Sequence, residues 1–372
     1  MPRFFDHAAT APMRTVAQKA WLEHADLLNA GGQYASGRRA RSVLDESRES
    51  IAELLGCEPI EVIFCASGTE ADNLALQGLW LNKGRGKVIA SGIEHPAVLE
   101  TVRHLESQGA EVTWLPVGSD GVVEGYREAF EGEASVATLM MANNETGAIQ
   151  PVQDFCDAAG RIPVHIDAVQ AVGHIPVHFH ELGATTLAAS AHKFGGPKGM
   201  GLLLAQRSPA PSAVLHGGGQ ERGIRPGTHD VAGAAATAAA LREAVEEMHS
   251  EQQRLTALKE TLRSAIAGIE DTVIHTPEDS LPGHVHASFL GAEADSLIML
   301  LDAQGFEAST GSACSNGVNR ASEVLLSMGV PYTTARSAVR FTLGRASSEE
   351  DVAELIAALP SLVERARLAG MA

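Results

Sequence analysis

One lysine lies where its amine could act as a nucleophile. Lys193 follows an apolar run, residues 186–189, which is expected to form a short buried strand that the glycines and proline at 195–197 end at once. The chain has only six lysines, and Lys193 is the one most clearly set among apolar and small residues. Burial lowers the pKa of an amine and frees it for Schiff-base chemistry. A solvated lysine in a β-turn is an equally weighted alternative for this segment alone.

An aspartate upstream favours the reactive lysine. Asp167 ends a strand-like run that starts at Ile162, so it is also expected at the carboxyl end of a strand, where a buried acid needs a cationic partner. Asp167 lies 26 residues before Lys193, which leaves room for one helical crossover between neighbouring parallel strands. An Asp and a Lys at adjacent strand ends could hold opposite ends of a flat ring, and pyridoxal enzymes place an Asp at the pyridinium nitrogen. The pair therefore indicates pyridoxal 5′-phosphate as a cofactor.

The surrounding segments predict the sheet that positions these residues. Strand-like and helical segments alternate between residues 61 and 206, which indicates a mainly parallel sheet covered by helices on both faces. Ligands bind beyond the carboxyl ends of the strands in such folds. A capping or core role is the favoured interpretation of His95 taken alone, but five candidates in order are harder to dismiss. These candidates are Gly68, His95, Asn144, Asp167 and Lys193.

Residues 61–79 combine a strand, a turn of small residues and the start of a helix. The free N–H groups and the dipole of a helix N-terminus bind anions, so the phosphate of the cofactor is expected at this turn. Such turns also occur without any ligand. The later glycine-rich stretch, residues 216–228, is no GxGxxG nucleotide motif because no strand-to-helix frame surrounds it.

Composition excludes several classes of protein. The chain has 372 residues and a formal net charge of −18, which argues against a nucleic-acid surface, since that requires a basic stripe. No apolar run approaches the roughly 18 residues of a membrane span, and the first residues have no apolar signal core, so we expect a cytoplasmic protein without a membrane partner. The four cysteines form no CxxC pair, which argues against structural zinc and against a disulfide framework.

The last third of the chain predicts a second, smaller α+β domain. A strand at 284–290, a helix at 293–301, a strand at 338–343 and a capping box at 347–350 that opens the final helix support it. We expect a large cofactor-binding domain at residues 14–250, linked onward by one or two long helices at about 231–269. Residues 1–13 with 251–372 would form the small domain.

Cys314 differs from the other cysteines. Cys57, Cys65 and Cys156 have apolar or amphipathic neighbours and are interpreted as small core residues. Cys314 lies in a loop of small residues, 308–317, that offers nothing to bury it. An exposed thiol in a cytoplasmic protein is a liability unless it is used, so a functional role is favoured.

These motifs together resemble the cysteine desulfurases, of the class V aminotransferase group within fold type I of the pyridoxal enzymes. The resemblance covers nearly the whole chain, and the cysteine loop at 311–314 is its most discriminating part because related aminotransferases lack it. It implies an α/β fold with a mainly parallel seven-stranded sheet and a smaller α+β domain. The matching motifs lie at residues 6–10, 67–73, 94–95, 143–147, 167–170, 190–193, 216–228 and 311–314.

The resemblance also implies roles for single residues. Lys193 would hold the cofactor and then shuttle protons, Asp167 would pair with the ring nitrogen, and Gln170 with the phenolic oxygen. His95 would stack on the ring and assist proton transfer, while Cys314 as a thiolate would attack the sulfur of the substrate. Phosphate binding would fall to Gly68, Thr69, Ser190, His192 and, from the partner subunit of a homodimer, Thr228. Asn144 and Arg340 would orient the substrate carboxylate, Arg340 through a bidentate pair.

The expected activity is conversion of L-cysteine to L-alanine, with sulfur passing to an enzyme persulfide and then to an acceptor protein. That acceptor would be an iron–sulfur scaffold or a tRNA-thiolation protein. Departures from the family pattern at residues 31–34, 226 and 320–322 leave its identity open. The alternatives are a selenocysteine lyase, a class V aminotransferase, or a catalytically silent scaffold in a sulfur-transfer complex.

Overall fold

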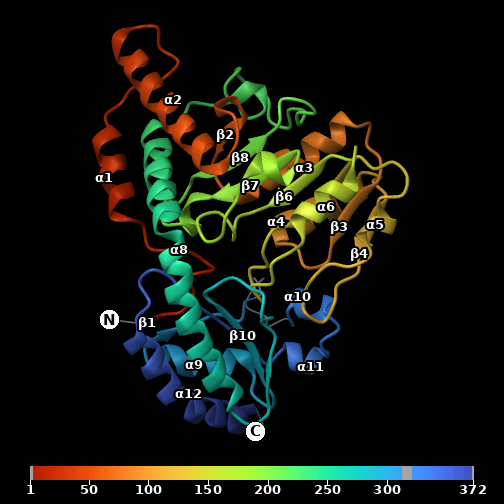
Figure 1. Ribbon diagram of the computed structural model, residues 1–372, viewed down its shortest axis with the longest axis vertical. Helices are drawn as coiled ribbons and strands as arrows, with labels where there is room; N and C mark the ends of the chain where they lie inside the picture. The colour runs from red at the N-terminus through yellow and green to blue at the C-terminus, as the bar shows by residue number, and fades with distance from the viewer. Residues whose placement is uncertain (1–2, 312–320, 371–372) are drawn as a thin grey trace.

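The computed structural model describes residues 3–311 and 321–370. Its largest element is a seven-stranded sheet (Figure 1), in which β8 alone runs opposite to the other six strands. The predicted α/β class with a mainly parallel sheet is therefore confirmed. The strand order is β2 (Val62–Cys65), β8 (Gly201–Ala205), β7 (Thr186–Ser190), β6 (Val164–Asp167), β5 (Val136–Met140), β3 (Val88–Ser91) and β4 (Val112–Leu115).

Helices cover both faces of this sheet because its strands are apolar on both sides. On β3, Ile89 packs into the core formed with α2 (Ala35–Leu55), α6 (Val152–Ala159) and α8 (Val231–Ala267). The neighbouring residues of β3 point to the opposite face, toward α3 (Gly68–Asn82) and α4 (Pro96–Ser107). Every sheet strand except the edge strand β4 is fully buried, as expected for parallel strands between two helical layers. The other helices of this layer are α1 (Thr15–His24), α5 (Tyr126–Ala129) and α7 (Phe179–Leu182).

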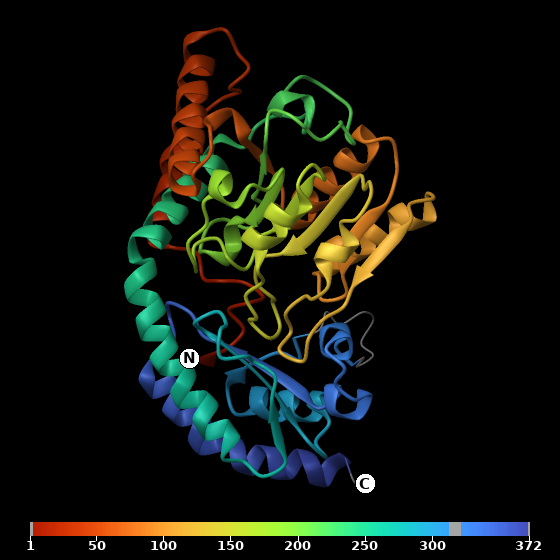
Figure 2. The same cartoon turned by 45° about the vertical axis from the view of Figure 1, so that its right-hand side comes forward.

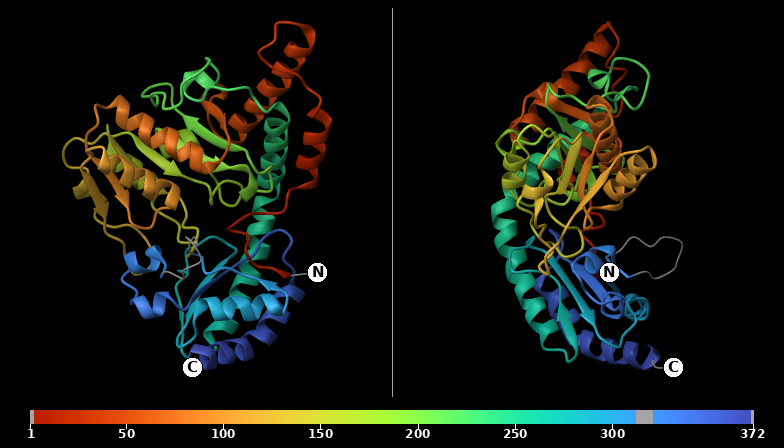
Figure 3. Two further views of the ribbon diagram at one scale, coloured as in Figure 1. Left: turned by 180° about the vertical axis from the view of Figure 1, so that it is seen from behind. Right: turned by 90° about the vertical axis from the view of Figure 1, so that its right-hand side faces the viewer.

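The large sheet and its covering helices form one layer of the molecule, and a second layer lies below it (Figures 1 and 3). Its three-stranded antiparallel sheet packs on α9 (Ala294–Ala303) and α12 (Glu349–Gly370), with a separate core that includes Phe5. The strand order is β12 (Ala338–Thr342), β10 (His284–Phe289) and β9 (Thr272–Ile274), while β1 (Arg3–Phe4) pairs with β11 (Phe306–Glu307). Two short helices, α10 (Glu323–Ser327) and α11 (Tyr332–Ala335), adjoin this layer, but their buried residues belong to the core of the large sheet.

One continuous helix joins the two layers (Figure 2). The 37 residues of α8 pack on α1 and α2 at one end and on α12, β9 and β10 at the other. The expected one or two long helices are thus a single helix. The expected domain boundary at residue 250 stays a prediction. Helix α8 crosses that point without a break.

One local expectation was wrong in detail. The final capping box is shifted by one residue. Ser348 Oγ accepts the N–H of Asp351 (3.1 Å) and Asp351 Oδ2 accepts the N–H of Ser348 (3.0 Å). No helix among the described residues is long and apolar enough to cross a membrane.

Candidate active site

A cavity of about 220 Å³ opens where β5, β6 and β7 end. Parallel strands present their carboxyl ends at one edge of the sheet, which is why residues far apart in sequence meet there. Most of the predicted site residues line this cavity. They are Gly68, Thr69, His95, Asn144, Asp167, Gln170, Ser190, His192 and Lys193.

Lys193 lies in a 3₁₀ turn directly after β7. Its Nζ donates hydrogen bonds to the carbonyl oxygens of Ala8 (2.5 Å) and Ala9 (3.0 Å). Burial, followed by repulsion from the Arg340 guanidinium, lowers the pKa of Lys193 to about 8. A substantial share of the amine is therefore neutral at mildly alkaline pH and can act as a nucleophile.

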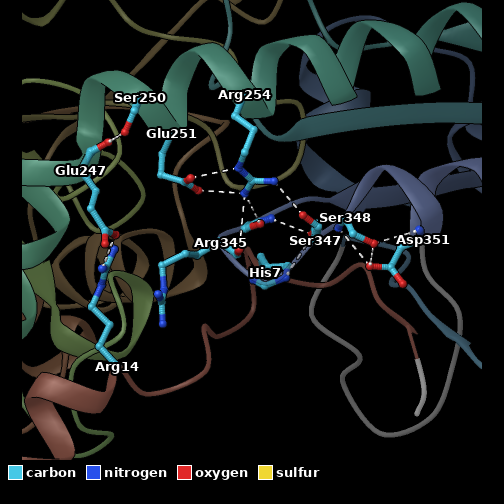
Figure 4. A network of polar contacts seen from close by, with 11 residues as sticks. His7, Arg14, Glu247, Ser250, Glu251, Arg254, Arg345, Ser347, Ser348 and Asp351 are labelled. Carbon is cyan, nitrogen blue, oxygen red and sulfur yellow. Dashed lines mark hydrogen bonds and ion pairs between the residues drawn. The ribbon is translucent and has the colours of Figure 1, made fainter.

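The Ala8 and Ala9 carbonyls lie on the N-terminal segment, which a polar network holds in place (Figure 4). Arg254 on α8 forms an ion pair with Glu251 (2.8 Å) and donates to the carbonyl oxygens of Gly344 (3.1 Å) and Ser347 (2.7 Å). The His7 ring lies against this turn, where a Cβ on Gly344 would be 2.2 Å from its Nδ1. The network joins α8, the N-terminal segment and the turn before α12.

Asp167 ends β6, whose neighbour in parallel register is β7. The expected placement of Asp167 and Lys193 on adjacent strand ends is therefore present. The carboxylate accepts the backbone N–H of Val169 (2.9 Å) and is buried. Burial raises the pKa of Asp167, while His95 and Lys193 counteract that effect. A cation bound at this end of the cavity would restore the ionised form.

A second aspartate at the cavity was missed by the sequence analysis. Asp72 lines the cavity, is buried, and lies 3.1 Å from Nε2 of His165, whose Nδ1 lies 2.9 Å from the Thr186 hydroxyl. Burial, with the charges of Asp167 and Glu94, raises the pKa of Asp72 well above its usual value. Because Asp72 lies one helical turn after Gly68, its position on the same face of α3 could have been found from spacing.

Glu94 was missed for a different reason, since it does not line the cavity. Its Oε1 accepts the N–H of Met140 (3.0 Å) and the hydroxyl of Ser91 (3.2 Å), and Oε2 has no partner within residues 3–311 and 321–370. Burial, and then the charge of Asp167, raise the pKa of Glu94 to about 8. Glu94 is therefore mainly protonated at neutral pH, which leaves Asp167 as the acid best placed to carry negative charge here.

Glu94→Gln is expected to gain stability relative to the wild type as pH rises. The carboxyl titrates near 4.5 in the unfolded chain and near 8 in the folded protein. Between these values the folded state keeps a proton that the unfolded chain has lost, so rising pH removes stability from the wild type and not from the glutamine variant. Urea unfolding of both proteins at the two ends of this window measures the effect. An equal stability difference at both ends contradicts it.

His95 caps a helix and also lines the cavity. It precedes Pro96 at the start of α4, and its Nδ1 accepts the N–H of Ala97 (3.1 Å) as a helix cap. The same ring lines the cavity. Burial lowers the pKa of His95 more than Asp167 raises it, so the ring is mainly neutral and the cap leaves the proton on Nε2.

The start of α3 lines one end of the cavity and has the local geometry expected of an anion site. Ser67 caps the helix by accepting the N–H of Glu70 (3.1 Å), and Gly68 and Thr69 follow in the first turn. A Cβ on Gly68 would lie 2.7 Å from Val169, so only glycine allows the helix to start so close to the end of β6. Backbone N–H groups at such a turn are donors for a phosphate.

Arg340 reaches the cavity through a neighbour rather than by lining it. On β12, its Nη1 donates to the carbonyl oxygen of Asn144 (2.6 Å) and its Nη2 to Asp6 (2.6 Å). Asn143 shapes the adjoining loop, because its side chain accepts the backbone N–H groups of Glu145 and Thr146 (2.9 Å each). Nε of Arg340 is buried and has no partner in the described part of the chain.

One predicted site residue lines a different cavity, and another falls outside the described residues. Thr228 lines a different cavity, of about 630 Å³, together with Arg48 and Glu221. Cys314 lies outside the described residues. Of its described flanks, Ser322 donates a hydrogen bond to Glu145, and a Cβ on Gly311 would lie 3.5 Å from both Glu145 and Arg340.

Comparison with known proteins agrees with this arrangement. Residues 3–355 match the aminotransferase class-V family. The chain is 43% identical to an IscS-like cysteine desulfurase of Mycobacterium tuberculosis, over 99% of this chain and 98% of that protein. It is 38% identical to a cysteine desulfurase IscS of Dictyoglomus turgidum, over 98% and 95% of the two chains. A solved NifS-like protein has a TM-score of 0.91 at 31% identity, covering 98% of this chain and 100% of that one.

The chain belongs to the aminotransferase class-V family and, within it, to the cysteine desulfurases, which depend on pyridoxal 5′-phosphate. The cavity fits that cofactor chemically. It combines an anion-binding turn at Gly68, a buried acid at Asp167 whose raised pKa calls for a cation, and an amine at Lys193 with a lowered pKa. The catalytically silent alternative is therefore set aside.

Proposed function

We propose that the residues around this cavity convert L-cysteine to L-alanine and pass the sulfur to Cys314. The main support is the meeting of Lys193, Asp167 and His95 in one cavity, with the Lys193 amine already shifted toward its neutral form. Pyridoxal 5′-phosphate, when bound, supplies an electron sink for the substrate. Gly68, Thr69, Ser190 and His192 would hold its phosphate, Asp167 its ring nitrogen, and Gln170 its phenolic oxygen.

Lys193 is then the proton carrier of the reaction. Its Nζ can take a proton as the neutral amine and give it back as the ammonium, which a pKa of about 8 allows near neutral pH. His95, with a proton on Nε2, supplies a second donor at the same cavity and assists this transfer.

Arg340 and Asn144 would bind the substrate carboxylate. The guanidinium already holds Asp6 and the Asn144 carbonyl, so an incoming carboxylate takes over donors that are preorganised by these contacts. At Cys314 the thiolate attacks the substrate sulfur: an S–S bond forms, the carbon–sulfur bond breaks, and the electron pair left on carbon takes a proton to give alanine. Gly311 lies close to Glu145 and Arg340, and Ser322 donates a hydrogen bond to Glu145. These two residues flank the segment of Cys314, and their position supports delivery of Cys314 from the side of the cavity where Arg340 lies.

A cytoplasmic homodimer that delivers sulfur to an acceptor protein completes the proposal. Support for the dimer comes from Thr228, which does not line the cavity of its own subunit, and from Trp21 and Leu22 on α1, which are exposed beside an apolar cavity. Thr228 of one subunit would add to the phosphate site of the other. The acceptor would be an iron–sulfur scaffold or a tRNA-thiolation protein.

Persulfide is expected on Cys314 after the enzyme is treated with L-cysteine, and mass spectrometry of its peptides tests this. Cys314→Ala should still bind substrate, seen as a change in cofactor absorbance, yet release almost no alanine. Cys65→Ala is the matched control, because burial raises the pKa of Cys65 above the useful range and leaves its thiol unreactive. Persulfide on another cysteine, or full alanine production by Cys314→Ala, would contradict the proposed reaction.

A further inference from the structure

Charged side chains anchor the loop at residues 216–228, which contains one short 3₁₀ turn, Glu221–Gly223. Glu221 is buried and accepts hydrogen bonds from Arg48 (2.6 and 2.9 Å), from Nε2 of His229 (2.8 Å) and from a backbone N–H of β2 (3.0 Å). Burial alone would raise the pKa of Glu221, but these contacts lower it to about 2. Glu221 and Arg222 both have left-handed backbones, with φ of 48° and 59°. Non-glycine residues keep that conformation only where their surroundings fix it.

Two more contacts anchor the same loop to the large sheet. Arg222 donates to the carbonyl oxygens of Ala205 (2.7 Å) and Gln206 (3.0 Å), where β8 ends. Ile224 is buried in an apolar cluster with residues of α3, β2, β7 and β8. The next residue, Arg225, is therefore presented from a rigid support.

Arg225 forms an ion pair with Glu70 on the first turn of α3, at 3.0 Å between Nε and Oε1. The other carboxylate oxygen of Glu70 accepts the N–H of Ala66. Gly68 and Thr69, which line the anion-binding end of the cavity, directly precede Glu70. A carboxylate is favourable at a free helix N-terminus, but it repels a phosphate that binds at the same turn. A cation that neutralises Glu70 removes this repulsion.

We propose that Arg225 is a positioning residue for the cofactor phosphate: it neutralises Glu70, and the loop anchored by Glu221 and Arg222 holds it there. The inference rests on the proposed function, since it requires the phosphate to bind at the start of α3. Arg225 does not line the cavity, so it acts on the phosphate through Glu70.

The test compares two ligands of the full-length enzyme after its cofactor has been removed: pyridoxal 5′-phosphate, and pyridoxal, which has no phosphate. Affinities are read from ligand absorbance and fluorescence, independently of turnover. Arg225→Ala is expected to lower the ratio of the affinity for pyridoxal 5′-phosphate to the affinity for pyridoxal about tenfold, because one unpaired negative charge then faces the phosphate. Adding Glu70→Gln should restore the ratio, since glutamine keeps an acceptor for Ala66. Arg222→Ala loosens the loop that holds Arg225 and should therefore lower the ratio in the same direction, but by less, because Arg225 keeps its charge.

The outcomes separate the inference from the function on which it rests. A wild type that binds both ligands equally would refute the phosphate site at α3, and with it that part of the proposed function. A wild type that prefers the phosphorylated ligand, beside an Arg225→Ala variant with an unchanged ratio, would overturn the inference alone. Failure of Glu70→Gln to restore the ratio would also overturn it, because the effect of Arg225 would then not pass through the Glu70 charge.

Discussion

Lys193→Ala is expected to lower turnover of L-cysteine by roughly 10⁴-fold, the upper range for one positioned proton-transfer group. The variant loses the only amine that lines the cavity within the described residues, and with it the covalent anchor for the cofactor. Borohydride reduction followed by peptide mass spectrometry should therefore fix the cofactor to Lys193 in the wild type and to no lysine in the variant.

The chain offers a matched control in its other buried lysine. Lys259 lies on α8 with its Nζ 3.2 Å from the Ser280 hydroxyl, and burial lowers its pKa as it does for Lys193. Lys259→Ala should keep cofactor labelling and turnover, because this amine does not line the cavity. Labelling of a different lysine in Lys193→Ala would show that the central assignment is mistaken.

Asp167→Asn is expected to keep the cofactor bound and to lower turnover roughly 10³-fold, the scale of losing one preorganised electrostatic contact. An amide cannot carry the negative charge that keeps the ring nitrogen protonated, so the electron sink is weakened. Steady-state alanine release measures the loss, and cofactor absorbance verifies that the site is occupied.

Asp72→Asn tests whether turnover depends on the charge of Asp167 in particular or on any acid that lines the cavity. Asp72 has a raised pKa and hydrogen bonds to His165, so it contributes little negative charge at neutral pH. Its amide variant should stay within about tenfold of wild-type turnover, a smaller loss than that for an essential proton-transfer group. Equal losses in the two variants would mean that the ring nitrogen does not depend on Asp167 alone.

Sequence reasoning predicted those parts of the site that local patterns determine. Asp167 and Lys193 each follow an apolar run, and the strand–helix alternation between them predicts parallel neighbours, so their meeting at one sheet edge follows from topology. The small-residue turn before α3 likewise predicts an anion site from local geometry. These inferences required no knowledge of distant contacts.

The remaining features depend on packing between distant segments. Glu94 is an ordinary glutamate in sequence, and only its burial beside Asp167 raises its pKa. Arg225 lies 155 positions from Glu70, and no local pattern predicts that pairing. Lys259 was overlooked as a buried lysine because its environment comes from the second layer rather than from its own helix. Residues of this kind need the tertiary structure.

The continuous course of α8 has a consequence for selection among substrates. A helix yields by bending, which strains hydrogen bonds along its length, whereas a loop yields by rotating a few dihedral angles. Helix α8 and the Arg254 network join the layer that carries Lys193 to the layer that carries Arg340 (Figures 2 and 4). The separation between Lys193 and Arg340, which are proposed to act at the amine and at the carboxylate of the substrate, is therefore fixed. It favours molecules whose amine and carboxylate are on the same carbon, and it disfavours β-amino acids, whose charged groups are one bond further apart.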